Sequence, residues 1–143
     1  MMRPLLIALG AALATLPALA QQHSFSCVGA EKLEDDVFSI AFQRGSARLT
    51  EAARSPLAAA IEAALAEPDR NICILGHAGQ EGGASTSIQL AAQRARAVTN
   101  AMAAQGVGSE RLRAEARSAQ FSPAIRAAEP PSRTVTIVLM PAP

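Results

Sequence analysis

Aromatic residues are scarce in this sequence, which has no tryptophan, no tyrosine and four phenylalanines among 143 residues. Proteins that bind single-stranded nucleic acids stack bases on aromatic side chains, so the scarcity argues against such a surface. The net charge of +1 also argues against a strongly basic surface for a polyanion. Neither G-x-x-x-x-G-K-[ST] nor G-x-G-x-x-G occurs, so the glycines do not indicate a nucleotide site.

Patterns for metal binding and catalysis are missing as well. The chain has two cysteines and two distant histidines, His23 and His77, and these do not have the spacing of metal ligands. No serine, aspartate or second histidine is placed to form a nucleophilic set with His77. We therefore expect no metal, no cofactor and no enzymatic activity, and a structural role for His77 in capping a loop.

The first twenty residues have the pattern of a secretory signal peptide. Arg3 gives a positive start, residues 5–16 are apolar, and Pro17 precedes the small-x-small sequence Ala18-Leu19-Ala20. An uncleaved anchor is the alternative, but the apolar run is shorter than the roughly 20 residues of a membrane-spanning helix. We expect cleavage after residue 20, a periplasmic protein starting at residue 21, and no membrane span after cleavage.

The two cysteines, Cys27 and Cys73, are expected to pair. A periplasmic location is oxidising and favours a disulfide, which would connect an N-terminal tail at residues 21–35 to a central strand. On the chain-entropy model, a bond closing a ring of this length stabilises the fold by about 4 kcal/mol at most. Two unpaired thiols, with Cys73 buried in the core, are the alternative. No cysteine directly follows the apolar run, so a lipidated N-terminus is not expected.

Hydrophobic periodicity predicts four strands and two helices after the tail. The expected strands cover residues 37–42, 71–75, 112–116 and 133–140. The first helix begins at Thr50, or with Ser55 as N-cap and Pro56 at the first position, and ends at Pro68. The second covers 84–105, after a glycine-rich loop at 76–83. This alternation predicts an α/β two-layer sandwich, β-α-β-α-β-β, with two helices packed on one mixed sheet.

Charge is unevenly distributed along the chain after residue 20. Residues 21–83 carry five basic and nine acidic residues, whereas residues 84–143 carry seven arginines and three glutamates. Solvated helix faces explain such a pattern without any ligand. The functional alternative is that Arg94 and Arg96, on the second helix, lie near an anion-binding site.

The glycine-rich loop and second helix resemble the OmpA-like C-terminal domain family of peptidoglycan binders. That family has the pattern G-H-T-D-x-x-G followed by Y-N-x-x-L-S-x-x-R-A-x-x-V. The matching positions in this sequence are Gly76, His77, Gly82, Leu90, Arg94, Ala95 and Val98. The stretches 42–50, 106–112 and 132–135 and Pro123 also resemble the family. The resemblance implies one OmpA-like domain at residues 36–140.

The resemblance also implies a ligand site. In the family, the aspartate of G-H-T-D and the arginine of R-A hold the diaminopimelate of the peptide stem. Its ammonium and carboxylate would pair with these two side chains. Here only Arg94 of that pair is present, because Gly79 stands at the aspartate position. Two residues further on, Glu81 is a candidate to replace the missing carboxylate.

Other family positions also differ. Thr86 and Ser87 replace the Tyr-Asn pair, and the last strand has Ser132-Arg133-Thr134-Val135 where the family usually has N-R-R-V. We name Arg94, Gly79, Glu81, Ser87 and Arg133 as candidate ligand-binding residues, although Arg94 on a helix surface and Arg133 at the sheet edge also allow purely structural roles.

Two functions follow from the resemblance. The first is a non-catalytic periplasmic module that binds the peptidoglycan peptide stem weakly or with altered specificity, because losing one partner of a desolvated charge pair is costly. The second is a degenerate OmpA-like domain that acts as a structural or protein-interaction module of the envelope without wall binding. In either case, outer-membrane association would go through the wall or a partner protein.

Overall fold

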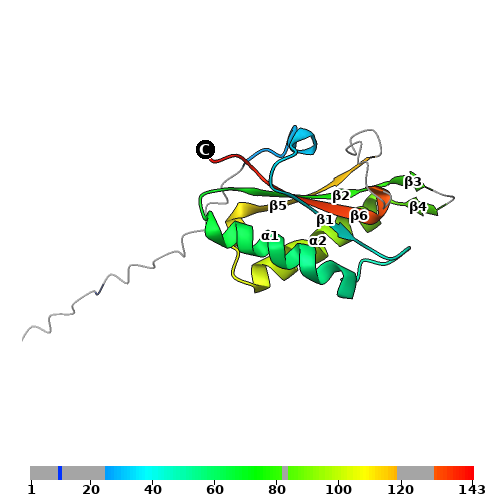
Figure 1. The fold of residues 1–143 in the computed structure, drawn as a ribbon, viewed down its shortest axis with the longest axis horizontal. Coiled ribbons are helices and arrows are strands. Elements are labelled where there is room, and N and C mark those ends of the chain that lie inside the picture. The colour runs from blue at the N-terminus through cyan, green and yellow to red at the C-terminus, as the bar shows by residue number, and fades with distance from the viewer. Residues whose placement is uncertain (1–9, 11–24, 82–83, 119–130) are drawn as a thin grey trace, which may run out of the picture.

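The computed structural model describes residue 10 and residues 25–81, 84–118 and 131–143, and it contains a two-layer α/β fold (Figure 1). The four strands of the main sheet are β1 (Val37–Ala41), β2 (Ile72–His77), β5 (Leu112–Arg117) and β6 (Thr134–Leu139). The helices are α1 (Arg54–Ala66) and α2 (Ile88–Ala104). The predicted signal peptide at residues 1–20 lies outside the described residues, Gly10 aside.

The main sheet has the strand order β1-β6-β2-β5, and both helices cover the same face of it. Strand β6 runs antiparallel to both of its neighbours, whereas β2 and β5 are parallel. The sheet is therefore mixed, and the predicted fold class is confirmed. In the described part of the chain, no helix is both long and apolar enough to cross a membrane.

A small hairpin separates β2 from α2, and the sequence analysis did not predict it. Strands β3 (Gly79–Glu81) and β4 (Ala84–Thr86) pair antiparallel where a glycine-rich loop and the start of a helix were expected. The predicted helix start at Ala84 is wrong, because residues 84–86 are extended and Ser87 is the N-cap. Its hydroxyl oxygen accepts a hydrogen bond from the Leu90 N–H at 3.0 Å.

The start of the first helix also differs from the prediction. A 3-10 turn at Glu51–Ala53 leads directly into α1 at Arg54, so Ser55 lies inside the helix and is not its N-cap. Pro56 remains within the first helical turn, where its missing N–H breaks no helical hydrogen bond. The helix ends at Ala66, before Pro68, as its sequence predicts.

Helix α2 packs closely on β2 because of a glycine. Gly76 faces α2, and a Cβ atom at this position would overlap the backbone carbonyl of Ala91. Neighbouring positions on this face of the sheet carry fully buried apolar side chains, including Ile72 and Ile74. The glycine of the Gly-His sequence therefore sets the approach of α2, which carries the site residues.

The opposite face of the sheet is partly covered by the segment before β1. Residues 27 and 30 of that segment are buried against Cys73, Leu75 and Val138, and Cys27 is bonded to Cys73. The predicted disulfide is thus present, with Cα atoms 5.8 Å apart. Residues 25–33, part of the expected tail, thus form a second small core on the sheet.

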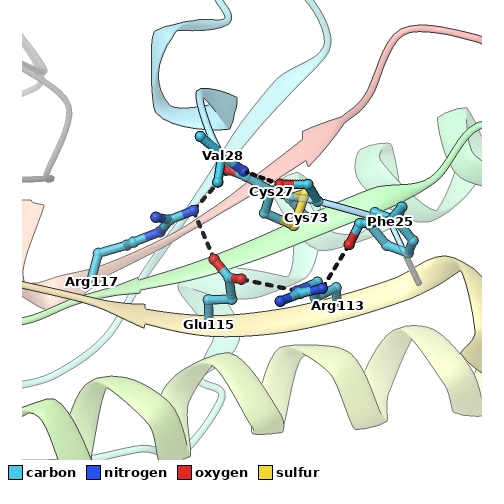
Figure 2. The surroundings of a disulfide bond; sticks show 8 residues. Phe25, Cys27, Val28, Cys73, Arg113, Glu115 and Arg117 are labelled. Atoms are coloured by element: carbon cyan, nitrogen blue, oxygen red, sulfur yellow. Dashed lines mark hydrogen bonds and ion pairs between the residues drawn. A yellow bond between two sulfur atoms is a disulfide. The ribbon is translucent and has the colours of Figure 1, made fainter.

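A row of charged side chains on β5 also holds this segment (Figure 2). Arg113 donates a hydrogen bond to the carbonyl oxygen of Phe25 at 2.7 Å, and Arg117 donates one to that of Cys27 at 2.8 Å. Glu115 lies between the two arginines and forms ion pairs with both. The bridge to β2 and the charged row on β5 together fix the N-terminal segment across the sheet.

We predict that Gly76→Ala destabilises the protein by about 1–3 kcal/mol, because the new methyl group must displace α2. Urea unfolding followed by circular dichroism measures this loss. Gly108→Ala is the matched control, since the added methyl meets only the flexible carboxylate of Glu110. Equal stability losses in the two variants would contradict the assigned role of Gly76.

We predict that Cys27→Ala/Cys73→Ala lowers the free energy of unfolding by up to about 4 kcal/mol, because the unfolded chain regains the entropy that the closed ring removes. Urea unfolding of the double variant, with and without a thiol reductant, measures the effect. The reductant should destabilise the wild-type protein and leave the double variant unchanged. A wild-type protein that is indifferent to the reductant would contradict this assignment.

Candidate functional site

The candidate ligand site lies where the β3–β4 hairpin, the start of α2 and the turns before α1 and β6 meet. Ser87 is exposed at the N-terminus of α2, and its hydroxyl oxygen already caps the helix. Helix N-termini carry a partial positive charge that favours a bound anion. This end of α2 therefore favours the binding of a negatively charged group.

Arg94 projects from the second turn of α2 and is almost completely buried, with 1% of its surface exposed. Its guanidinium donates to the carbonyl oxygens of Ser46, Gln43 and Ser132 at 2.7, 3.0 and 3.0 Å. A fourth hydrogen bond goes to the hydroxyl of Thr86 at 3.2 Å. Arg94 thus connects three separate segments, and most of its donors are occupied by the protein itself.

A second cation lies next to Arg94. Arg133 is partly exposed at the end of the 3-10 turn Pro131–Arg133. Burial lowers the pKa of Arg94, and the positive charge of Arg133 lowers it further. Since two like charges near each other favour an anion between or beside them, the pair suits a carboxylate.

Position 79 has an unusual backbone conformation in addition to lacking a side chain. Gly79 has a φ of 152°, a value that residues with a Cβ atom rarely adopt. An aspartate at this position would strain the hairpin in its present form. Glu81 belongs to β3, where it pairs with Ala84, and its side chain is outside the described part of the structure.

His77 lies apart from this arrangement. Its side chain is fully buried, and its Nε2 atom lies 2.7 Å from the hydroxyl oxygen of Thr136. Burial lowers its pKa to about 4, and the charge of Arg117 contributes in the same direction. No described residue forms a hydrogen bond with the Nδ1 atom of His77. His77 is therefore a neutral, buried histidine that contacts the last strand rather than capping a loop.

The sequence analysis missed the partners of Arg94. Three of them are backbone carbonyls, in Gln43, Ser46 and Ser132, and a carbonyl acceptor leaves no trace in residue type. Thr86 is the exception, because its place in the motif could have indicated a contact with Arg94 eight residues later. No group of three or more histidine, cysteine or acidic side chains among the described residues could hold a metal ion.

Comparison with known proteins points to one family. The profile of the OmpA family matches residues 41–135, whereas a search of the curated proteins finds no match. Of the solved structures, the peptidoglycan-associated lipoprotein from Burkholderia pseudomallei has a TM-score of 0.58 and 22% identity, over 72% of this chain and 90% of that one. The OmpA-like domain of FopA1 from Francisella tularensis has a TM-score of 0.59 and 20% identity, over 78% and 79%.

A third similar structure is the cell wall anchor of the T6SS from Pseudomonas aeruginosa. Its TM-score is 0.52 with 23% identity, and the match covers 72% of this chain and 79% of that one. At these identities the structures share the fold. The profile match covers the hairpin, α2 and both turns that Arg94 connects.

The lowered pKa of His77 predicts that the protein becomes less stable as the pH is lowered. The imidazole pKa is about 4 in the folded protein and 6.5 in the unfolded chain, so the stabilisation is complete above pH 6.5. Between pH 6.5 and 4 it is lost by about 1.4 kcal/mol per pH unit, about 3 kcal/mol in total. Urea unfolding at several pH values, compared between the wild type and His77→Gln, isolates this contribution. His23→Gln is the control and should keep the wild-type dependence of the free energy of unfolding on pH. The same dependence in His77→Gln would refute the assignment to His77.

Proposed function

The chain belongs to the OmpA family, and from this membership and the geometry around Arg94 we propose that it is a non-catalytic module that binds the peptide stem of peptidoglycan. The site consists of the α2 N-terminus with Ser87, the β3–β4 hairpin, and the paired cations Arg94 and Arg133. The helix N-terminus and the two cations favour a carboxylate.

Arg94 and Arg133 have different roles at this site. Among the described residues, the hydrogen bonds of Arg94 to its own chain leave one N–H of its fork for a ligand. Its larger contribution is to hold the turn at Gln43 and the turn at Ser132 beside α2. Arg133 is partly exposed, so its guanidinium is the accessible donor for the ligand carboxylate.

The ammonium of diaminopimelate has no partner at position 79, because Gly79 has no side chain. Glu81, in the same hairpin strand, is the proposed replacement. Without a well-placed carboxylate the site favours the negative end of the ligand over its positive end. We therefore expect binding weaker than that of a site with both aspartate and arginine. The alternative is a preference for peptide stems in which that ammonium is not free.

The second candidate function is a structural or protein-interaction module of the envelope without wall binding. The observations that favour it are the backbone conformation of Gly79, which disfavours an aspartate, and the commitment of Arg94 to carbonyl oxygens. A domain with these features keeps the fold of the family while its site loses ligand contacts.

The same proposal includes the cellular location. A cleaved signal peptide at residues 1–20 places the protein in the periplasm, and the Cys27–Cys73 disulfide is consistent with an oxidising compartment. Solved relatives whose names mention peptidoglycan or the cell wall support this location. Association with the outer membrane then goes through the wall or a partner protein.

Sedimentation with insoluble peptidoglycan tests the first function. The wild-type protein should sediment with the wall, and Arg133→Gln should weaken binding about tenfold to a hundredfold, since a hydrogen bond to a charged group contributes about 1.5–3 kcal/mol. Glu81→Gln should also weaken binding. Arg96→Gln is the matched control, because Arg96 is exposed on α2 outside the site and should leave binding unchanged.

Failure of the wild-type protein to sediment would support the second function. Equal losses in the Arg133 and Arg96 variants would show nonspecific charge attraction and overturn the assigned site. Arg94→Ala is not used as the probe, because removal of a buried guanidinium disrupts the turns as well as any ligand contact. Gly79→Asp is unsuitable for a similar reason, the strain at φ 152°.

A further inference from the structure

An open apolar groove runs between the two helices, on the face of the molecule turned away from the sheet. It has a volume of about 590 Å³ and lies along most of α1. Its lining is formed by the apolar residues Leu57, Ala58, Ile61, Leu65, Ala101 and Ala104, with Arg54, Glu62 and Gln105 at its rim. Neither the family site nor the disulfide involves this groove.

The groove exposes apolar side chains of α1 to solvent. Leu65 is 49% exposed, one of three large hydrophobic side chains so exposed among the described residues. Leu57 and Ile61 reach from the groove to the core, so the floor of the groove is continuous with the interior. Exposed apolar surface with a polar rim is characteristic of a protein–protein contact.

The charges on this side of α1 are placed against the preference of a single helix. Arg54 is its first residue, at the positive end of the helix dipole, and Glu62 lies in the half nearer the negative end. Among the described residues, Arg54 forms an exposed ion pair with Glu51 at 3.3 Å. Such a pair contributes little in water. The dipole of α1 alone therefore does not explain the positions of Arg54 and Glu62.

We propose that this groove is the interface of a two-fold homodimer in which α1 of one copy lies antiparallel to α1 of the other. A two-fold contact places the same surface on both sides, so the surface must be complementary to itself. The antiparallel arrangement meets this condition: Arg54 of each copy comes to the end of the partner helix that carries Glu62. The helix dipoles also oppose each other favourably.

The apolar residues fit the same arrangement. Alanines 58, 101 and 104 leave room for the side chains of a facing helix, and Leu65 and Ile61 provide them. Helix α1 has 13 residues and is about 20 Å long. One helix pair of this length makes a small interface, so the dimer should be weak and reversible.

Analytical ultracentrifugation of the purified full chain over a micromolar to millimolar range tests the dimer. The wild-type protein should shift from the mass of one chain to that of two. Leu65→Glu should remain monomeric throughout. Ile88→Glu is the matched control, because Ile88 is 50% exposed but lies at the start of α2, away from the groove, and this variant should still dimerise.

A charge exchange tests the antiparallel orientation. Arg54→Glu and Glu62→Arg should each weaken the dimer, since like charges then face one another, and the double variant should restore the wild-type affinity. An equimolar mixture of the two single variants should form a heterodimer, because both of its charge pairs are again opposite in sign. A wild-type protein that is monomeric at all concentrations, or a dimer unaffected by Leu65→Glu, would overturn the proposal.

Discussion

The structure around the site depends on one buried guanidinium. Arg94 donates to carbonyl oxygens before α1 and before β6 and to the Thr86 hydroxyl at the end of the hairpin, so three segments far apart in the sequence share one hydrogen-bonding centre. A buried cation is costly unless its donors are satisfied, and these acceptors supply the compensation. A lysine has neither the planar fork nor enough directed donors for the same task.

Arginines fulfil this role elsewhere in the chain. Arg111 donates to the carbonyls of Ala64, Glu67 and Arg70 and so closes the C-terminal end of α1. Arg70 in turn donates to the carbonyl oxygens of Leu139, the last residue of β6, and of Met140. The predominance of arginine over lysine, which composition alone leaves uninterpreted, acquires a physical role: several arginines connect loop and strand ends by hydrogen bonds to backbone carbonyls.

The sequence allowed prediction of the layers, because β-branched runs and helical stripes directly report burial. It also allowed the disulfide to be expected, since only two cysteines occur in a chain with a secretory pattern. The hairpin at 79–86 escaped prediction because three-residue strands with glycines carry no periodic signal, and tertiary pairing overrides the helical tendency of Ala84. For the site, the sequence allowed prediction of Arg94 as a candidate residue. The carbonyl oxygens that bind its guanidinium could not be predicted, because they depend on the fold and not on residue type.

The disulfide also has a mechanical consequence. A pull on the N-terminus enters the domain at Cys27 and passes through the covalent bridge directly to Cys73 in β2, an inner strand with neighbours on both sides. Strand β2 leads immediately to the hairpin and to α2, where the wall ligand is proposed to bind. Tension between the N-terminus and a bound wall ligand would therefore travel along one central strand, in shear against β5 and β6. Edge strand β1 and helix α1 would lie outside the load path.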